Sequence, residues 1–425
     1  MNESTAESKK EAYRNLRHNF LINVLDGAFY GVALGFASFT TILPLFVSQM
    51  TNSGLLIGLI PGLHVLGWQL PQLLTAKRLS RLNRFTPFVL ITSIHERLPY
   101  LGLAFVAWFL PTIGNRTGLI LTFLLLTWQG IGSGVTANGW QNLIGKVIPA
   151  ENRATFFGTQ SAFSNLLSSV GAIIAGLILQ KLPARESYAL CFLIALLFVS
   201  FSWISLTQNR ETDHIVEMSG ITQMPLWNSI IVIFKRDRNF LWFLIARMLS
   251  QFGLMAFAFY TVYAVNEHGM SKLSAGLMTS ILLIVQVSSN LILGRLADRW
   301  SKKALLEFGC IATLLSALLA ALAPTLYWFV IVFVLAGLAN TAFWTVGLAI
   351  TVEFGKESER PTYIGMANTL TAPAALFAPL FGGWLADRFG YTTTFLVAVT
   401  ASLITALIYH YFISDPAQER YGLMA

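Results

Sequence analysis

Four charged side chains lie within long apolar runs of the sequence. Asp26 and Arg247 each lie several residues inside such a run, and Glu96 and Arg97 are adjacent near the middle of a third. A charge in the middle of a membrane costs on the order of 3 kcal/mol or more, so each of these side chains should have a partner or a task. A buried carboxyl group could take up and release a proton, because its pKa responds to burial and to neighbouring charges.

Polar and aromatic side chains recur at helical spacing and form stripes. His64, Trp68 and Gln72 share one face, as do Arg247 and Gln251. We expect these stripes to line a cavity with aromatic walls and few hydrogen-bonding groups, which would suit an amphipathic organic molecule. The alternative is that they join helices to one another, as Ser, Asn and Gln often do in membranes. The candidate cavity residues are Tyr30, His64, Trp68, Trp128, Gln129, Trp140, Gln251, Gln286, Asn290, Asn340 and Trp344.

The elements that must position these residues are membrane-spanning helices. Of 425 residues, 55% are hydrophobic and only 11% are charged, which is too apolar for a soluble domain of this size. Because a helix needs roughly 20 apolar residues to cross a bilayer, the apolar runs predict twelve spans. The predicted spans are 20–48, 54–75, 86–110, 117–145, 156–180, 187–207, 239–266, 273–294, 303–323, 325–353, 361–385 and 391–413.

The basic residues predict the orientation of these spans. Most of the 28 Lys and Arg residues fall on the two termini and on the loops after the second, fourth, sixth, eighth and tenth spans. The positive-inside rule assigns that side to the cytoplasm. We therefore expect a multi-pass protein of the cell membrane (plasma or inner membrane) with both termini cytoplasmic. The net charge of +8 follows from this topology and does not indicate nucleic acid.

The two halves of the chain repeat one plan. Arg153 to Gly158 (RATFFG) aligns with Arg360 to Gly365 (RPTYIG), and Asn19-Phe20-Leu21 aligns with Asn239-Phe240-Leu241. The repeat predicts two six-helix bundles joined by a linker with an amphipathic interfacial helix. The predicted domains are a cytoplasmic tail (1–19), an N-terminal bundle (20–207), a cytoplasmic linker (208–238), a C-terminal bundle (239–413) and a second cytoplasmic tail (414–425).

One loop carries a family signature. Gly294 to Lys303 reads G-R-L-A-D-R-W-S-K-K and falls between the eighth and ninth spans. It resembles the major facilitator signature G-x-L-A-D-R-x-G-R-K and departs from it only at Ser301 and Lys302. The resemblance implies an all-α membrane protein with twelve transmembrane helices in two pseudo-symmetric six-helix bundles. It also implies alternating-access transport, driven by a gradient and without ATP hydrolysis.

The expected partners follow from this resemblance. We expect a small-molecule substrate, protons and the lipid bilayer, a functional monomer, and no cofactor or metal. Family antiporters for drugs and metabolites carry G-x-x-x-G-P-x-x-G-G in helix five. Here that segment, Leu167 to Gly176, lacks the proline, and a fuller version, Ala378 to Gly383, lies in helix eleven. Proton-coupled efflux is slightly favoured, and uptake of a sugar or organic anion by symport is the alternative. A membrane-embedded enzyme or a non-transporting sensor is a further alternative, but no catalytic cluster such as H-E-x-x-H is present in the sequence.

The resemblance also ranks the buried charges. In this family helix one lines the pathway and helix three lies outside its bundle. Asp26 is therefore the better coupling candidate, with Tyr30 one turn along the same face, whereas Glu96 and Arg97 could simply brace the bundle. Alternatively, Asp26 forms a structural salt bridge with Arg97. Arg247 would face an anionic ligand or Asp26 itself, and a proton or a substrate anion could break that pair.

The gate residues implied by the resemblance are Gly294, Asp298 and Arg299, with Asp298 holding the cytoplasmic gate through basic residues and a helix end. In the first half, Lys77 falls where Asp298 falls in the second. Glu359, which precedes helix eleven, could accept Lys77 and form a latch of reversed polarity. The alternative is a degenerate loop that only sets orientation, since an exposed ion pair contributes ~0–1 kcal/mol.

Overall fold

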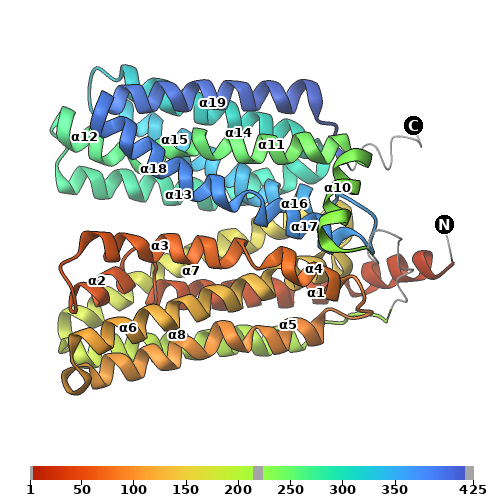
Figure 1. Ribbon diagram of the computed structural model, residues 1–425, viewed down its shortest axis with the longest axis horizontal. Helices are drawn as coiled ribbons and strands as arrows, with labels where there is room; N and C mark the ends of the chain where they lie inside the picture. The colour runs from red at the N-terminus through yellow and green to blue at the C-terminus, as the bar shows by residue number, and fades with distance from the viewer. Residues whose placement is uncertain (1–2, 214–223, 417–425) are drawn as a thin grey trace. The chain divides into compact units, whose positions relative to one another are not determined.

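The computed structural model describes residues 3–213 and 224–416, and all regular secondary structure in these ranges is helical. Contacts divide the chain into two compact units (Figure 1). Unit 1 comprises Met1–Pro149 and Phe163–Met218, and unit 2 comprises Ala150–Ala162 and Ser219–Ala425. The first turns of the fifth spanning helix therefore belong to unit 2, although the rest of that helix belongs to unit 1.

Unit 1 is built from the first half of the chain. Its helices are α1 (Glu3–Phe36), α2 (Ile42–Ser48), α3 (Gly54–Gln69), α4 (Gln72–Leu79), α5 (Thr86–Thr92), α6 (Ile94–Val147), α8 (Ala184–Thr207) and the later part of α7 (Arg153–Lys181). Helices α1 and α6 both pack against α8. Fully buried Tyr100 and Phe192 belong to the apolar core of this unit.

Unit 2 repeats this arrangement. Its elements are the short helix η1 (Ala150–Asn152) with the start of α7, α10 (Leu226–Arg236), α11 (Arg238–Leu254), η2 (Met255–Ala258), α12 (Tyr260–His268), α13 (Lys272–Arg299), α14 (Lys302–Leu322), α15 (Trp328–Thr341), the π-helical turn η3 (Ala342–Val346), α16 (Gly347–Thr351), α17 (Arg360–Thr369), α18 (Ala372–Phe389) and α19 (Tyr391–Phe412). Helices α14 and α11 pack against α19, and Tyr260 and Phe395 lie in the core.

Twelve spans account for these helices. Among the described residues, ten helical segments are long and apolar enough to cross a membrane. One of them, Thr86–Val147, has 62 residues and contains non-helical Gly114 (φ 76°), so it holds two spans. The predicted second span is divided into α3 and α4 at Pro71, and neither piece is long enough alone. The prediction of twelve spans in an all-α protein is confirmed.

Close helix contacts depend on glycine. A Cβ atom on Gly134 of α6 would collide with the backbone oxygen of Gly67 in α3. In unit 2, a Cβ on Gly294 of α13 would come 2.6 Å from the backbone oxygen of Ala154 and 3.1 Å from the Cα of Gly158 in α7. Side chains at these positions would force the helices apart.

Each unit is closed by the same arrangement, which we call the clasp. In unit 1, Asn19 of α1 exchanges two hydrogen bonds with the backbone of Arg210, at 3.0 and 3.1 Å. The next residue, Glu211, accepts hydrogen bonds from the backbone N–H groups of Phe85 and Thr86 at the start of α5, at 2.7 and 2.8 Å. The segment after the sixth span therefore joins the first span to the third.

The clasp of unit 2 uses the equivalent positions. Asn239 of α11 exchanges hydrogen bonds with the backbone of Ser414 at 2.9 and 3.0 Å. Asp415 then accepts hydrogen bonds from the N–H groups of Lys302 and Lys303 at the start of α14, at 2.8 and 3.3 Å. A carboxylate at a helix N-terminus satisfies otherwise unpaired donors. The acids of the two clasps, Glu211 and Asp415, lie beyond the predicted bundle ends at 207 and 413.

Two predicted boundaries differ from the helix limits. Helix α1 begins at Glu3, so the predicted tail 1–19 and the first span form one helix from that residue onward. The predicted linker contains the helix α10, and its residues 214–223 lie outside the described part of the chain.

Candidate functional site

The buried charges of unit 1 form one network. The hydroxyl of Tyr30 donates to Glu96 Oε1 at 2.5 Å, and Glu96 Oε2 lies 3.6 Å from Arg97 Nη1. Arg97 also donates to the backbone oxygens of Ser93 (3.0 Å) and Val199 (2.9 Å). Arg97 thus joins α6 to α8, while Glu96 is held by one cation and one hydroxyl.

Asp26 joins this network through a hydroxyl group. Ser202 of α8 receives a hydrogen bond from Arg97 Nη2 at 3.0 Å and donates one to Asp26 Oδ1 at 2.6 Å. The indole of Trp140 also interacts with Asp26. No direct Asp26–Arg97 salt bridge within 4 Å is present in the described residues of this unit, so Ser202 takes the place of the expected pair. Asp26 is therefore a buried carboxylate, only 6% exposed, whose hydrogen-bond donors are neutral.

Arg247 in unit 2 also has neutral partners. It donates to Thr351 Oγ1 at 3.0 Å and to Asn368 Oδ1 at 3.3 Å, and its guanidinium lies 5.8 Å from the ring centre of Phe243. Its backbone oxygen accepts a hydrogen bond from Gln251 at 3.4 Å. Within the described part of unit 2, Arg247 has no ion pair. The guanidinium is therefore a half-buried cation without an ion-pair partner in the described part of its unit.

The predicted stripe in unit 1 is only partly brought together. His64 stacks on Phe39 with ring centres 3.9 Å apart, and fully buried Gln129 lies beside it. Trp128, the neighbour of Gln129, is 40% exposed and donates to His95 at 3.3 Å. Trp128 and Gln129 therefore belong to different faces of α6.

Trp68 is half-buried one turn beyond His64 in α3. Its backbone oxygen accepts a hydrogen bond from the side chain of Gln72 at 2.8 Å.

The stripe in unit 2 converges on the π-helical turn. Buried Asn290 of α13 accepts a hydrogen bond from Thr345 in η3. Asn340 and Trp344 are exposed, and Gln286 is half-buried on α13. A π-helical turn within an α-helix is often found at a functional site, because it re-aims the side chains that follow it.

Asp298 contacts a helix end, as the loop signature implied. Its two carboxylate oxygens accept hydrogen bonds from the N–H groups of Ala154 (3.0 Å) and Thr155 (2.6 Å) in the first turn of α7. Lys302 Nζ lies 3.7 Å from Asp298 and 3.0 Å from Glu353. The side chains of all three charged residues are at most 5% exposed.

Glu359, the expected acceptor for Lys77, has another partner in its own unit. Arg236 of α10 forms a two-point ion pair with Glu359 and also donates to Tyr363 at 3.3 Å. The hydrogen bonds to Glu359 raise the pKa of Arg236. The Glu359 side chain is only 1% exposed, whereas Lys77 and Arg299 are exposed. The linker helix α10 is thus fastened to the start of α17.

A protein-family model matches most of the chain. The Major Facilitator Superfamily model matches residues 94–265 and 243–422. The chain belongs to the Major Facilitator Superfamily. The family consists of transporters, and its fold has twelve transmembrane helices in two halves. The resemblance drawn from the loop signature is confirmed.

The similarity of this facilitator to solved structures extends over nearly the whole chain. FucP in the outward conformation superposes with a TM-score of 0.76 at 14% identity, over 93% of this chain and 98% of FucP. The human organic anion transporter MFSD10 superposes with a TM-score of 0.71 at 13% identity, over 92% and 99% of the two chains. At these identities the likeness shows the fold alone.

Sequence relatives match over shorter stretches. A Na⁺, Li⁺, K⁺/H⁺ antiporter of Planococcus maritimus is 29% identical over 37% of this chain and 38% of its own length. The multidrug resistance protein MdtG of Salmonella arizonae is 26% identical over 36% and 38%. The alignments thus span less than half of each of these relatives.

Several residues that organise this facilitator escaped the sequence analysis. Ser202, Glu211, Arg236 and Asp415 each make contacts that join separate helices. Only the repeated Asn19 and Asn239 pointed toward the clasps. An alignment of the two halves that included the acid after the sixth and twelfth spans would have found Glu211 and Asp415.

Proposed function

We propose that this facilitator is a proton-coupled secondary transporter of a small organic molecule that works by alternating access. Asp26 would carry the coupling proton, and export by antiport would be the physiological direction. The observation that carries the proposal is the hydrogen-bond chain from Arg97 through Ser202 to Asp26.

Asp26 suits proton transfer because of its neutral donors. A carboxylate inside the membrane is costly, and its proton affinity depends on the hydrogen bonds and charges around it. Protonation would remove the charge that orders the Ser202 hydroxyl, and Ser202 also holds Arg97 of α6. A proton at Asp26 would therefore change the bonding between α1, α6 and α8. Glu96 is a less suitable carrier, because Arg97 and Tyr30 already stabilise its charge.

Arg247 would bind an anionic group of the substrate. Its hydrogen bonds to Thr351 and Asn368 orient the guanidinium but leave its charge without a local counter-ion. A carboxylate or phosphate can bind a guanidinium by two parallel hydrogen bonds. Gln251, whose side chain donates to the backbone oxygen of Arg247, would add a polar contact beside it. This feature favours an organic anion among the possible substrates.

The direction of transport rests on the names of the sequence relatives, an antiporter and a multidrug resistance protein. The second candidate function is uptake by symport. FucP of E. coli is described as a fucose:proton symporter, but it shares with this chain only the fold. The half-buried cation Arg247 would bind an organic anion during uptake by symport just as it would during export.

The experiment uses purified protein in liposomes that contain a pH-sensitive dye. Compounds that raise the unfolding temperature of the protein would be added on one side, and proton movement recorded. We expect substrate-dependent proton movement that is lost in Asp26→Asn and retained in Asp387→Asn, because Asp387 is an exposed acid. Substrate-driven proton movement that persists in Asp26→Asn would remove Asp26 as the carrier. Proton movement in the same direction as the substrate would establish symport.

The orientation is also a proposal. We propose a monomer in the cell membrane with both termini cytoplasmic, supported by the concentration of Lys and Arg on the termini and on alternate loops. Labelling of single cysteines at Tyr13 and Trp300, which are 52% and 64% exposed, from either side of sealed vesicles would test it.

A further inference from the structure

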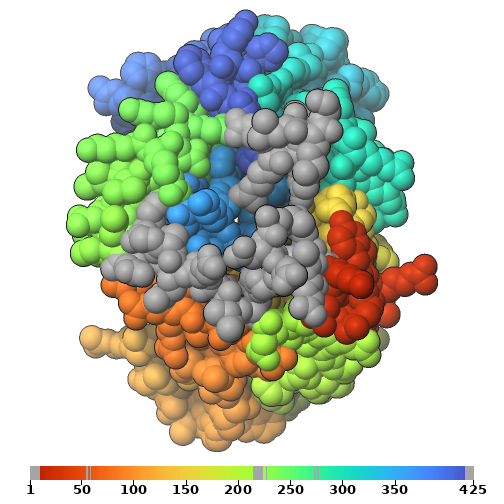
Figure 2. Space-filling view, turned by 90° about the vertical axis from the view of Figure 1, so that its right-hand side faces the viewer, coloured from red at the N-terminus to blue at the C-terminus, as the bar shows by residue number. Residues whose placement is uncertain are grey.

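The helix that begins the first span of unit 1 ends before the span does. Helix α1 ends at Phe36 and α2 begins at Ile42, so residues 37–41 form a non-helical break within the predicted span 20–48. The early turns of α1, in red, lie at the face seen in Figure 2, and the break follows after the 34 residues of this helix. Non-helical backbone inside a membrane is tolerated only where it is buried in protein or lines a water-filled cavity.

Pro44 accounts for the position of the break. A proline has no N–H group, and its ring collides with the carbonyl group of the residue four positions earlier in a helix. That residue is Thr40, which lies in the break. On the other side, the last turn of α1 is fixed by close packing, because a Cβ atom on Gly35 would come 2.4 Å from the backbone oxygen of Ser168 in α7. The break therefore follows from the sequence and from the packing of unit 1.

The break leaves backbone oxygens without hydrogen-bond donors. The N–H of Leu43 donates to the backbone oxygen of Ser38 at 2.9 Å, and the N–H of Thr40 donates to the hydroxyl of Ser38 at 3.3 Å. In the described part of the chain, the carbonyl oxygens of Phe36, Phe39 and Thr40 accept no hydrogen bond. They lie at or just after the C-terminal end of α1, which carries the negative end of the helix dipole.

Two side chains beside the break have polar atoms without partners. His64 of α3 stacks on Phe39, and fully buried Gln129 of α6 lies close to His64 but not in hydrogen-bond geometry. His64 Nδ1 and both amide atoms of Gln129 are buried, and none of the three has a hydrogen-bond partner among the described residues. Polar atoms buried in this way are costly, so they point to a ligand.

The unpaired groups indicate the class of ligand. The carbonyl oxygens and the amide oxygen of Gln129 are acceptors, and the break itself, Ala37 to Thr41, contains no charged residue. Unwound backbone carbonyls and the C-terminal ends of half-helices bind Na⁺ in membrane transporters. A divalent ion such as Ca²⁺ usually has carboxylate ligands. The neutral acceptors of the break therefore favour a monovalent cation.

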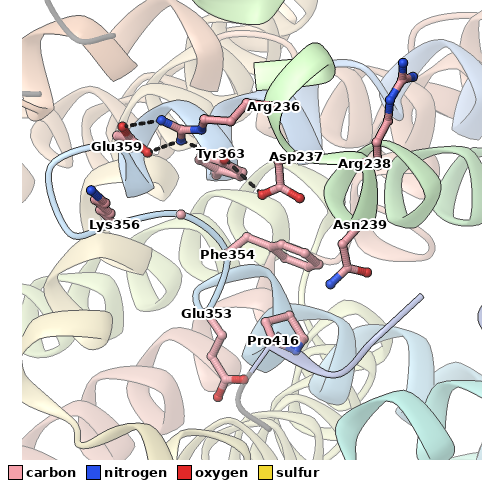
Figure 3. A pocket seen from close by; sticks show the side chains of 11 residues that line it. Arg236, Asp237, Arg238, Asn239, Glu353, Phe354, Lys356, Glu359, Tyr363 and Pro416 are labelled. Atoms are coloured by element: carbon pink, nitrogen blue, oxygen red, sulfur yellow. Dashed lines mark hydrogen bonds and ion pairs between the residues drawn. The ribbon is translucent and has the colours of Figure 1, made fainter. Parts of the chain in front are cut away.

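The cavity beside α10 in unit 2 offers a contrast. It has a volume of about 630 Å³, and its wall contains both acidic and basic residues. Arg236 is paired with Glu359, and the hydroxyl of Tyr363 donates to Asp237 at 3.0 Å (Figure 3). Charges of both signs in one wall do not select one class of ligand, whereas the unpaired acceptors of the break do.

We propose that the break in the first span binds a monovalent alkali cation. The carbonyl oxygens of Phe39 and Thr40 would be ligands, and His64 and Gln129 would supply further acceptors. Thr40 and Thr41 are exposed, so the ion would reach the site without crossing the core of unit 1. A bound cation would replace the missing helical hydrogen bonds and join α1, α2 and α3. This site is separate from Asp26, to which the proposed proton transfer is assigned.

The test measures the unfolding temperature of the full-length protein in detergent. Sodium chloride, potassium chloride and choline chloride are compared at one ionic strength. A cation that binds the folded state stabilises it by mass action, so the unfolding temperature should rise with the concentration of Na⁺ or K⁺ and then level off. Choline, which is too large for a site made of backbone carbonyls, should not have this effect.

Two variants change the site. Pro44→Ala restores an N–H group that can donate to the carbonyl of Thr40, so the half-saturating cation concentration should rise about tenfold, as for the loss of one contact to a charge. His64→Phe keeps an aromatic ring against Phe39 but removes the acceptor, and should change the affinity in the same direction. Pro379→Ala is the matched control, because Pro379 lies inside the spanning helix α18 of the other unit.

Three outcomes would overturn the proposal. Equal unfolding temperatures in the three salts would show that no alkali cation binds. An unchanged cation dependence in both Pro44→Ala and His64→Phe would place the ion elsewhere, and so would an equal loss in Pro379→Ala. Because the readout is binding and not transport, a failure here is distinguishable from a failure of the proposed function.

Discussion

The contact between Asp298 and α7 gives the sharpest prediction. In Asp298→Asn, one side-chain oxygen remains as an acceptor. The second oxygen is replaced by an NH₂ group, which cannot accept the hydrogen bond that the backbone N–H donates there. The lost contact is a hydrogen bond from Ala154 (3.0 Å) or Thr155 (2.6 Å) to a charged acceptor. A hydrogen bond to a charged group contributes ~1.5–3 kcal/mol. The Asp298 side chain is 4% exposed, so water screens this contact little.

A loss of about 2 kcal/mol would shift the equilibrium between docked and undocked α7 by about 30-fold, since each 1.4 kcal/mol is tenfold. A cysteine at Ala154, which is fully buried in the docked helix, reports this equilibrium. The background is Cys191→Ser with Cys310→Ser, which removes the two native cysteines, both buried. We expect maleimide labelling of the cysteine at 154 to rise at least tenfold in Asp298→Asn, and transport to fall while membrane insertion is kept.

Asp387→Asn is the matched control, since Asp387 is an exposed acid at the end of α18 and stands in the same Leu-Ala-Asp-Arg sequence (385–388) as Asp298 (296–299). Unchanged labelling in Asp298→Asn, or the same rise in Asp387→Asn, would refute the reasoning.

Further predictions concern the clasps and the linker. Asn19→Ala and Asn239→Ala should each lower the free energy of unfolding by ~1–2 kcal/mol, because each removes two hydrogen bonds. The two losses should add, because the sites are in different units. Chemical unfolding of the single and double variants checks this, and a double variant as stable as either single variant would contradict it. Glu359→Lys should place two cations together and lower the unfolding temperature, and Arg236→Glu in the same chain should restore it. If Glu359 instead forms a latch with Lys77, Lys77→Glu alone should favour the inward-open state, and adding Glu359→Lys should reverse that effect. Labelling of cytoplasmic cysteines measures the inward-open population in the single and double variants. Purely additive effects of the two substitutions would reject a Lys77 latch.

Much of the fold could be predicted from the sequence because it depends on local patterns. The apolar runs predict the spans, since lipid requires roughly 20 apolar residues for each helix. The repeat of Asn19 at Asn239 predicts the correspondence of the two halves, and both residues make the same pair of hydrogen bonds. Asp298 was singled out because its loop has a strong sequence signature.

The candidate site was less accessible to sequence reasoning. Trp128 and Gln129 were assigned to one cavity, but adjacent helical residues point in different directions, and the structure places Trp128 against His95. The Ser202 bridge to Asp26 joins residues 176 positions apart, so no local pattern reveals it. The ion pair between Arg236 and Glu359 was not predicted, because it depends on where α10 packs and not on a local sequence pattern.

The clasps have a consequence for the evolutionary history of the chain. In each half, the acid that caps the third span comes from just beyond the sixth span. A gene segment that encoded only six helices would have left that helix end without its acceptor after duplication. The ancestral segment is therefore expected to have extended past its sixth helix, as far as the residue that became Glu211 in one copy and Asp415 in the other. Sequence added between the copies, such as the helix α10, would have entered only after that acid.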